Sequence, residues 1–144
     1  MLAEALNGNQ VLTELNISNN ALDLAGAIAL ANAIKDMRAL TSLHVGRNSI
    51  PEKEMREIMA IAMRMDSMKI LCEVPFKDKT LTELDVSGKD LGMEGALVIA
   101  EYLDGNGAMI SLNLSNNQLV SYLKDGYGDA YCDLSGELGL LLSH

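Results

Sequence analysis

The sequence has few of the side chains on which most enzymes and disulfide-bonded proteins depend. Its 144 residues include two His, one Phe and no Trp, and aromatic residues make up only 3%. With two histidines, His-based catalytic triads and His-rich zinc sites are close to excluded. Cys72 and Cys132 fit neither a disulfide framework nor a CxxC metal site, so we expect reduced thiols. The core has to be aliphatic, because large rings are almost absent.

Basic residues are also scarce, and no stretch of the chain concentrates them. Lys and Arg number 11 against 20 Asp and Glu, which gives a formal net charge of −9. This balance lacks the electrostatic footprint of a nucleic-acid-binding protein or of a basic helix on a membrane surface. No apolar run reaches the roughly 20 residues of a membrane span, and the first residues do not resemble a signal peptide. We therefore expect an intracellular, cytoplasmic domain with no nucleic-acid or membrane partner.

One short pattern recurs four times in a single frame, and it decides the expected fold. The copies cover residues 12–22, 40–50, 81–91 and 109–119, with the alternating apolar pairs Leu15/Ile17, Leu43/Val45, Leu84/Val86 and Leu112/Leu114. Leu12 to Leu40 and Leu81 to Met109 are both steps of 28 residues. The alternation predicts a short strand with one buried face in each copy.

The second half of each copy predicts a helix. After the first strand come Ala27, Leu30, Ala31 and Ile34, which are related by spacings of three and four residues and so give a helix one buried stripe. A 28-residue unit with the pattern LxxLxLxxNxL resembles the leucine-rich repeat, and its length is similar to that of the ribonuclease-inhibitor subtype. The resemblance implies an α/β solenoid shaped like a horseshoe, with parallel strands on the concave face and helices on the convex face.

The repeat frame gives a single leucine-rich repeat domain over residues 1–144. Its units are a partial repeat over 1–11, repeats over 12–39, 40–67 and 81–108, a short repeat over 68–80, and a last unit over 109–144 with an irregular C-terminal loop. In this frame we expect residues 2–8 to be the closing half of a preceding helix, so that the chain would begin in the middle of a repeat without a capping unit. Two alternatives therefore stay open: a fragment of a longer array with no separate activity, and self-association through uncapped ends.

The middle of the chain departs from the 28-residue step. Leu40 and Leu81 are 41 residues apart, and the excess predicts a short extra strand over about 70–74, ended by Pro75, with no helix before Leu81. In the preceding helix, three methionines follow one side at regular spacing: Met55, Met59 and Met63. We interpret them as core filler, which is favoured over a partner-binding groove.

A polar position after each strand is expected to tie neighbouring repeats together. Asn20, Asn48 and Asn117 occupy it in three copies, and an amide there can bond backbone groups that have no other partner. Lys89 takes the position in the third copy. Because an ammonium group cannot accept a hydrogen bond, we expect this turn to be looser or to be satisfied by water.

The sequence offers little for catalysis or cofactor binding. It contains no Walker loop, no GxGxxG turn and no GxSxG elbow. Asp125, Asp129 and Asp133 recur every fourth residue, but this register does not match an EF-hand loop, so a solvated acidic loop is favoured over a metal site. We expect a protein that is not an enzyme and needs no cofactor or metal.

Two surfaces are candidate protein-binding sites. The first consists of outward positions on the predicted strands, small, polar and mildly acidic: Glu14, Asn16, Ser42, His44, Glu83, Asp85, Ser111 and Asn113. Such a wall would favour a basic partner, although any solvated strand face carries similar residues. The second is a glycine-containing loop with Tyr122, Tyr127 and Tyr131, which are typical of a contact patch or else cover the last layer of the solenoid.

The predicted function is a non-enzymatic scaffold that mediates protein–protein interaction. Repeat scaffolds present many different partners on the same wall, so the pattern does not identify the partner. The resemblance implies one enzymatic alternative, since relatives of this subtype include activators of small GTPases. No catalytic arginine of that group maps onto Arg38, Arg47, Arg56 or Arg64.

Overall fold

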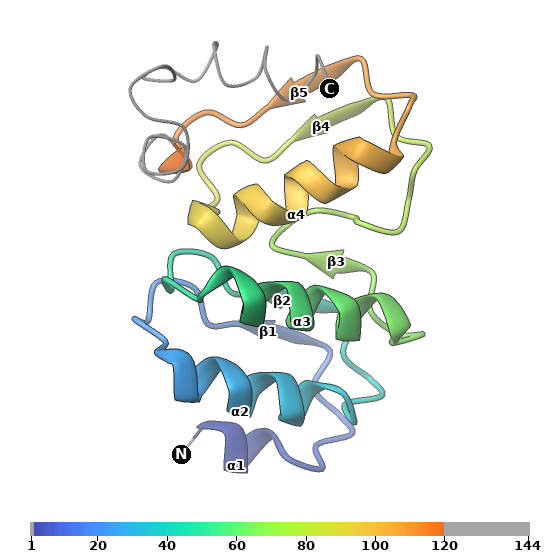
Figure 1. Ribbon diagram of the computed structural model, residues 1–144. Helices are drawn as coiled ribbons and strands as arrows, with labels where there is room; N and C mark the ends of the chain where they lie inside the picture. Colours follow the sequence, from blue (N-terminus) through green and yellow to red (C-terminus); the bar gives the residue numbers. More distant parts are fainter. Residues whose placement is uncertain (1, 120–144) are drawn as a thin grey trace.

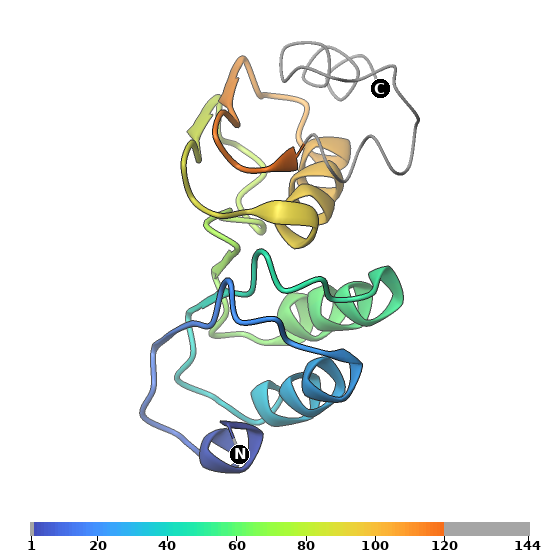
Figure 2. The ribbon, with the colours of Figure 1, turned by 90° about the vertical axis from the view of Figure 1, so that its left-hand side faces the viewer.

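The computed structural model describes residues 2–119, in which short strands alternate with helices (Figure 1). The elements are, in chain order, α1 (Leu2–Leu6), β1 (Glu14–Asn16), α2 (Leu24–Ile34), β2 (Ser42–His44), α3 (Glu52–Arg64), β3 (Ile70–Leu71), β4 (Glu83–Asp85), α4 (Gly92–Gly105) and β5 (Ser111–Asn113). The strands line one side of the stack and the helices the other, as Figure 2 shows. This layering is that of the solenoid-type α/β fold that the repeat pattern predicts.

The strands pair in parallel, with the register set by the 28-residue step. Leu15 lies opposite Leu43, and Leu84 lies opposite Leu112. The strands form two sheets, however, with the orders β1-β2-β3 and β4-β5. A solenoid with all its parallel strands on one concave face would have one shared sheet, and this sheet is interrupted at one place, between β3 and β4.

The core is aliphatic, as the lack of aromatic residues predicts. Buried side chains from both layers include Ile17, Leu30, Ile34, Leu43, Met55, Ile58, Leu71, Val86, Ile99 and Leu114. Burying one such side chain stabilises the fold by roughly 1.5–3 kcal/mol. The interpretation of the α3 methionines as core filler is confirmed for Met55, which is fully buried, and is wrong for Met63, which is 54% exposed.

Buried asparagine side chains join neighbouring repeats. Asn48 Oδ1 accepts the backbone N–H groups of Asn20 at 2.8 Å and Leu22 at 3.2 Å, and Asn48 Nδ2 donates to the carbonyl oxygen of Ile17 at 2.9 Å. Asn117 joins the fourth copy to the third in the same way: its Oδ1 accepts the backbone N–H group of Lys89 at 2.8 Å. The predicted role of these two amides is confirmed.

The short repeat ends the first sheet with a tight turn. β3 has two residues instead of the expected five, because the chain reverses at Cys72 and Glu73, whose φ angles are 48° and 66°. Leu71 and Val74 exchange both backbone hydrogen bonds across this turn, each 2.9 Å long. Two central residues at positive φ are the geometry of a type I′ hairpin. The hairpin occupies the outer edge of β3, so β4 cannot pair with it.

A carboxylate replaces the missing asparagine where the two sheets meet. Glu94 Oε2, in the first turn of α4, accepts the backbone N–H groups of Asn48 at 3.2 Å and Ile50 at 2.7 Å. In the repeat frame, the side chain expected to accept these two hydrogen bonds is that of residue 89, which is a lysine. The expected loose or hydrated turn is therefore wrong, because a buried side chain five residues further along accepts both bonds.

The turns of the second and third copies meet directly at this junction, although 41 residues separate them. An added Cβ on Gly46 would lie 2.0 Å from the carbonyl oxygen of Asp90, so the two backbones approach too closely for any side chain at this position. Arg47 and Asp90 form an ion pair of 3.1 Å beside it. The extra residues of the short repeat therefore do not separate the two copies at this end of the strands.

Candidate binding surfaces

Seven of the predicted concave-face residues stand at the surface of the strands. Glu14 pairs in register with Ser42, Glu83 with Ser111, and Asp85 with Asn113. All are exposed except Ser42, which is half-buried, and Asn16 is exposed at the end of β1. We call these seven residues the strand wall. The sheet break divides the strand wall into a part on β1 and β2 and a part on β4 and β5.

His44 does not belong to the strand wall, which corrects the sequence prediction. Its ring is only 5% exposed, because the turn of the third copy lies over it. The Gly46 N–H donates to His44 Nδ1 at 3.3 Å, so Nε2 carries the proton and donates to the Lys89 carbonyl oxygen at 2.6 Å. His44 is thus a contact within the junction and is not exposed on the strand side.

Three strand-wall residues also stabilise the turns that follow their strands. Asn16, Asp85 and Asn113 each accept, through Oδ1, the backbone N–H and the hydroxyl of the serine two residues later. The backbone and side-chain hydrogen bonds from Ser87 lower the pKa of Asp85. The β4 part of the strand wall therefore keeps this negative charge in mildly acidic solution.

Ile70 is a surface residue that the repeat pattern did not identify. It pairs in register with Ser42 and is 37% exposed, so an aliphatic side chain stands beside the polar strand wall. The signal was present in the spacing, since Ile70 is 28 residues after Ser42 and shares its outward position. The second predicted site, Tyr122, Tyr127 and Tyr131, lies outside the described residues, as do Asp125, Asp129 and Asp133.

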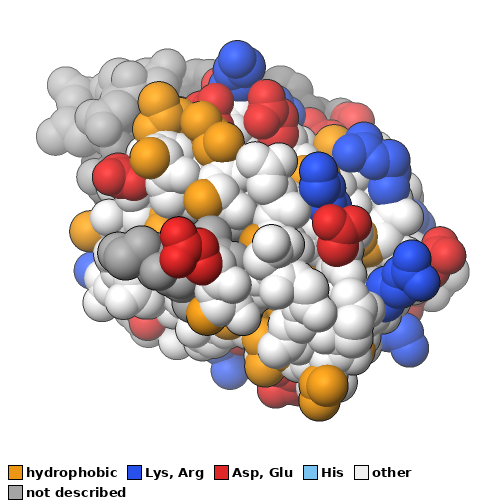
Figure 3. Space-filling model, turned by 90° about the horizontal axis from the view of Figure 1, so that it is seen from below, with side chains coloured by type: hydrophobic (Ala, Val, Ile, Leu, Met, Phe, Trp, Pro, Cys, Tyr) orange, Lys and Arg blue, Asp and Glu red, His pale blue; other side chains and the backbone are white. Residues whose placement is uncertain are grey.

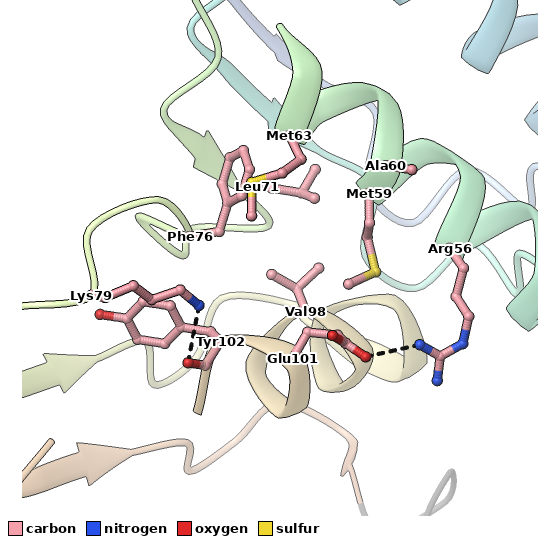
Figure 4. A pocket seen from close by; sticks show the side chains of 10 residues that line it. All are labelled: Arg56, Met59, Ala60, Met63, Leu71, Phe76, Lys79, Val98, Glu101 and Tyr102. Carbon is pink, nitrogen blue, oxygen red and sulfur yellow. Dashed lines mark hydrogen bonds and ion pairs between the residues drawn. The ribbon is translucent and has the colours of Figure 1, made fainter. Parts of the chain in front are cut away.

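A cavity opens between α3 and α4 where the short repeat has no helix (Figure 4). Its volume is about 340 Å³, and its lining consists of Arg56, Met59, Ala60, Met63, Leu71, Phe76, Lys79, Val98, Glu101 and Tyr102. The ion pair between Arg56 and Glu101, 3.0 Å long, closes one end. Its walls are mainly apolar, and the 13 extra residues of the short repeat were the sequence signal for it.

The other end of this cavity is held in place by Tyr102. Its hydroxyl donates to the Asp78 carbonyl oxygen at 2.7 Å, and Lys79 Nζ lies 4.8 Å from its ring centre. Burial raises the pKa of the Tyr102 hydroxyl, which therefore stays a hydrogen-bond donor. These contacts hold the short repeat against α4 at this end of the cavity.

Cys72 lies in the hairpin that ends the first sheet and is fully buried. Burial raises the pKa of its thiol to about 12, and the charge of Glu94 acts in the same direction. A neutral thiol without solvent access is a poor nucleophile. The sequence expectation of an unpaired thiol fits this position.

Cys72 is therefore expected to resist alkylation until the protein unfolds. In a Cys132→Ser variant at about pH 8, iodoacetamide should modify the native protein at least ~100-fold more slowly than the urea-denatured protein, because the thiolate fraction is small and the site is covered. Intact-mass spectrometry over time measures both rates. Equal rates would contradict the buried position of Cys72.

The described residues offer no site for a metal ion or a membrane span. Within residues 2–119, no group of three or more His, Cys, Asp and Glu side chains is placed to hold a metal. None of the helices described is long and apolar enough to cross a membrane. What the described surface offers is the strand wall on one side and hollows between the helices on the other.

Comparison with known proteins agrees with the repeat architecture. A family model described as "Leucine Rich repeat" matches residues 8–31 and 77–100, which contain β1 and β4 and the first parts of α2 and α4. Protein NLRC5 from Homo sapiens is 26% identical over 156 aligned residues, which cover 83% of this chain. The chain spans 8% of the length of that relative.

Proposed function

The chain is a leucine-rich repeat protein, and from that premise we propose that it is a non-enzymatic interaction module of the ribonuclease-inhibitor subtype. Leucine-rich repeats generally mediate protein–protein interaction. The proposed site is the strand wall, and the proposed partner is a protein with a basic segment.

The observation that carries this proposal is the charge of the strand wall. Glu14, Glu83 and Asp85 are exposed on strands whose neighbouring wall residues are uncharged. No cationic side chain of residues 2–119 occupies an outward strand position beside them. A basic segment that lies along the strands would meet three carboxylates, which increases association rate and selectivity more than affinity.

Ile70 supports the same site. Interfaces derive most of their binding energy from a few side chains in desolvated positions. Ile70 offers an aliphatic contact between the two parts of the strand wall, where an aliphatic partner side chain would cover it. Polar residues on both sides would then form the rim.

Neutralising the strand wall is expected to weaken partner binding roughly five- to tenfold, since each exposed ion pair contributes about 0.2–1 kcal/mol. The test variant is Glu14→Gln/Glu83→Gln/Asp85→Asn, in which the new amide at position 85 keeps the oxygen that accepts from Ser87. The measurement is affinity capture from an extract of the source cells on the immobilised full chain, with quantitative mass spectrometry.

A matched control removes the same number of charges from the helices. Glu54→Gln/Glu57→Gln/Asp104→Asn alters α3 and α4 and leaves the strand wall intact. Proteins bound at the strand wall should be lost from the first variant and retained by the second. Retention by both variants would refute this site.

A further inference from the structure

A second hollow lies on the edge of the molecule where α2 and α3 end. Its volume is about 480 Å³, and its lining consists of Lys35, Met37, Arg38, Ile61, Arg64, Met65, Asp66 and Ser67. Seen from the α1 end, several Lys and Arg side chains gather along one side of the molecule, at the right of Figure 3. We call this hollow the basic hollow. Three of the 11 basic residues of an acidic chain line it.

These cations differ from the other arginines in having no partner. Arg47 pairs with Asp90, and Arg56 pairs with Glu52 and Glu101. Within residues 2–119, by contrast, the charged groups of the three lining cations Lys35, Arg38 and Arg64 make no hydrogen bond or ion pair. Their charges are therefore available to a ligand.

The negative ends of the two helices offset only part of this positive charge. The C-terminus of a helix carries about half a negative charge, so the ends of α2 and α3 together offset about one cation, and Asp66 offsets another. Among the residues that line the hollow, one positive charge remains. At physiological salt, charges more than about 8 Å away are largely screened, so a ligand inside the hollow responds mainly to the lining charges and their immediate neighbours.

The bottom of the basic hollow is apolar. Met37 and Met65 are buried, and Ile61 is half-buried. Methionine is unbranched and adapts to the shape of an incoming side chain. The hollow thus combines three cations with an apolar floor.

We propose that the basic hollow binds an acidic peptide segment of another protein, with carboxylates against Arg38 and Arg64 and an aliphatic side chain on Met37 and Met65. The planar guanidinium groups suit carboxylates, which they bind through two parallel hydrogen bonds. A second copy of this chain is a poorer occupant, because both copies carry a net charge of −9.

This site is independent of the proposed strand-wall function. It lies at the helix ends, has the opposite charge and selects the opposite kind of partner. Failure of one proposal leaves the other untouched, because the strand-wall variant described above keeps every residue of the basic hollow.

The test uses a fluorescein-labelled peptide of sequence Glu-Leu-Glu-Glu-Leu-Glu and the full chain, with fluorescence anisotropy as the readout. The variant Arg64→Glu should weaken binding roughly tenfold, because it removes one charge contact and adds a repulsion. The matched variant Lys53→Glu makes the same charge change at the other end of α3, and it should alter binding less than about twofold. A peptide with Gln in place of Glu should bind at least fivefold more weakly.

A second variant controls for any effect that Arg64→Glu, at the end of α3, has on folding. Arg38→Gln lies beyond the end of α2 and should weaken binding roughly threefold, with an unchanged circular dichroism spectrum. Equal losses in Arg64→Glu and Lys53→Glu would reduce the effect to net charge and overturn the proposal. If the Gln peptide bound as tightly as the Glu peptide, the proposed peptide site would also be overturned. Full displacement of the Glu peptide by millimolar inorganic phosphate would overturn it as well.

Discussion

Replacing Glu94 by Ala is expected to lower the free energy of unfolding by about 2–4 kcal/mol. The substitution leaves the backbone N–H groups of Asn48 and Ile50 buried without an acceptor, and each such donor costs about 1–3 kcal/mol. Loss of a buried carboxylate offsets part of this cost, because Glu94 is 0% exposed and its Oε1 has no partner within the described residues.

Comparison with Glu94→Gln separates the effect of the hydrogen bonds on stability from the effect of the charge. This variant keeps an amide oxygen for both donors and removes the charge, so its stability should lie within about 1 kcal/mol of the parent chain. Glu57→Ala, on the exposed face of α3, should change stability by less than about 0.5 kcal/mol. Urea denaturation followed by circular dichroism measures all three variants. If Glu94→Ala and Glu57→Ala were equally stable, the carboxylate would have no role in joining the repeats.

Gly46→Ala is expected to destabilise the fold by about 3 kcal/mol or more. The new Cβ would stand 2.0 Å from the Asp90 carbonyl oxygen and 2.7 Å from that of Leu91. Both are backbone atoms, so relief requires the two turns to move apart. That movement would lengthen the 2.6 Å bond between His44 and the Lys89 carbonyl and the 3.1 Å ion pair between Arg47 and Asp90.

Gly107→Ala is the matched control for this steric effect. An added Cβ at Gly107 meets no atom within 4 Å, and the change should stay within about 0.5 kcal/mol. Amide chemical shifts in a two-dimensional NMR spectrum locate the disturbance: Gly46→Ala should shift residues 89–94, and Gly107→Ala should not. A small effect of Gly46→Ala on stability would mean that the turns are not in contact.

Features that repeat at a fixed spacing were predictable from the sequence. The pairing of Leu15 with Leu43 follows from the 28-residue step alone. So does the bond between the Asn20 backbone and Asn48, because the two residues hold the same position in adjacent copies. In such cases one local pattern determines both partners, and no knowledge of distant packing is needed.

The junction was not predictable, because it joins residues with no common spacing. Glu94 has the ordinary signature of an acidic residue in the first helical turn, and nothing local indicates that it accepts bonds from residues more than 40 positions earlier. The burial of His44 likewise depends on a distant segment, the turn at Lys89, whose carbonyl oxygen bonds to its ring. The shape of the cavity between α3 and α4 depends on how the short repeat packs against α4, which the 28-residue spacing does not determine.

The type I′ hairpin at residues 71–74 has a consequence for how the protein loses its structure. It terminates one sheet, so across residues 2–119 the two sheets are held together by side chains and turn contacts instead of a backbone ladder. All-or-none melting of the two halves then depends on a few groups such as Glu94. Weakening those groups should split one transition into two, with each half behaving as a separate cooperative unit.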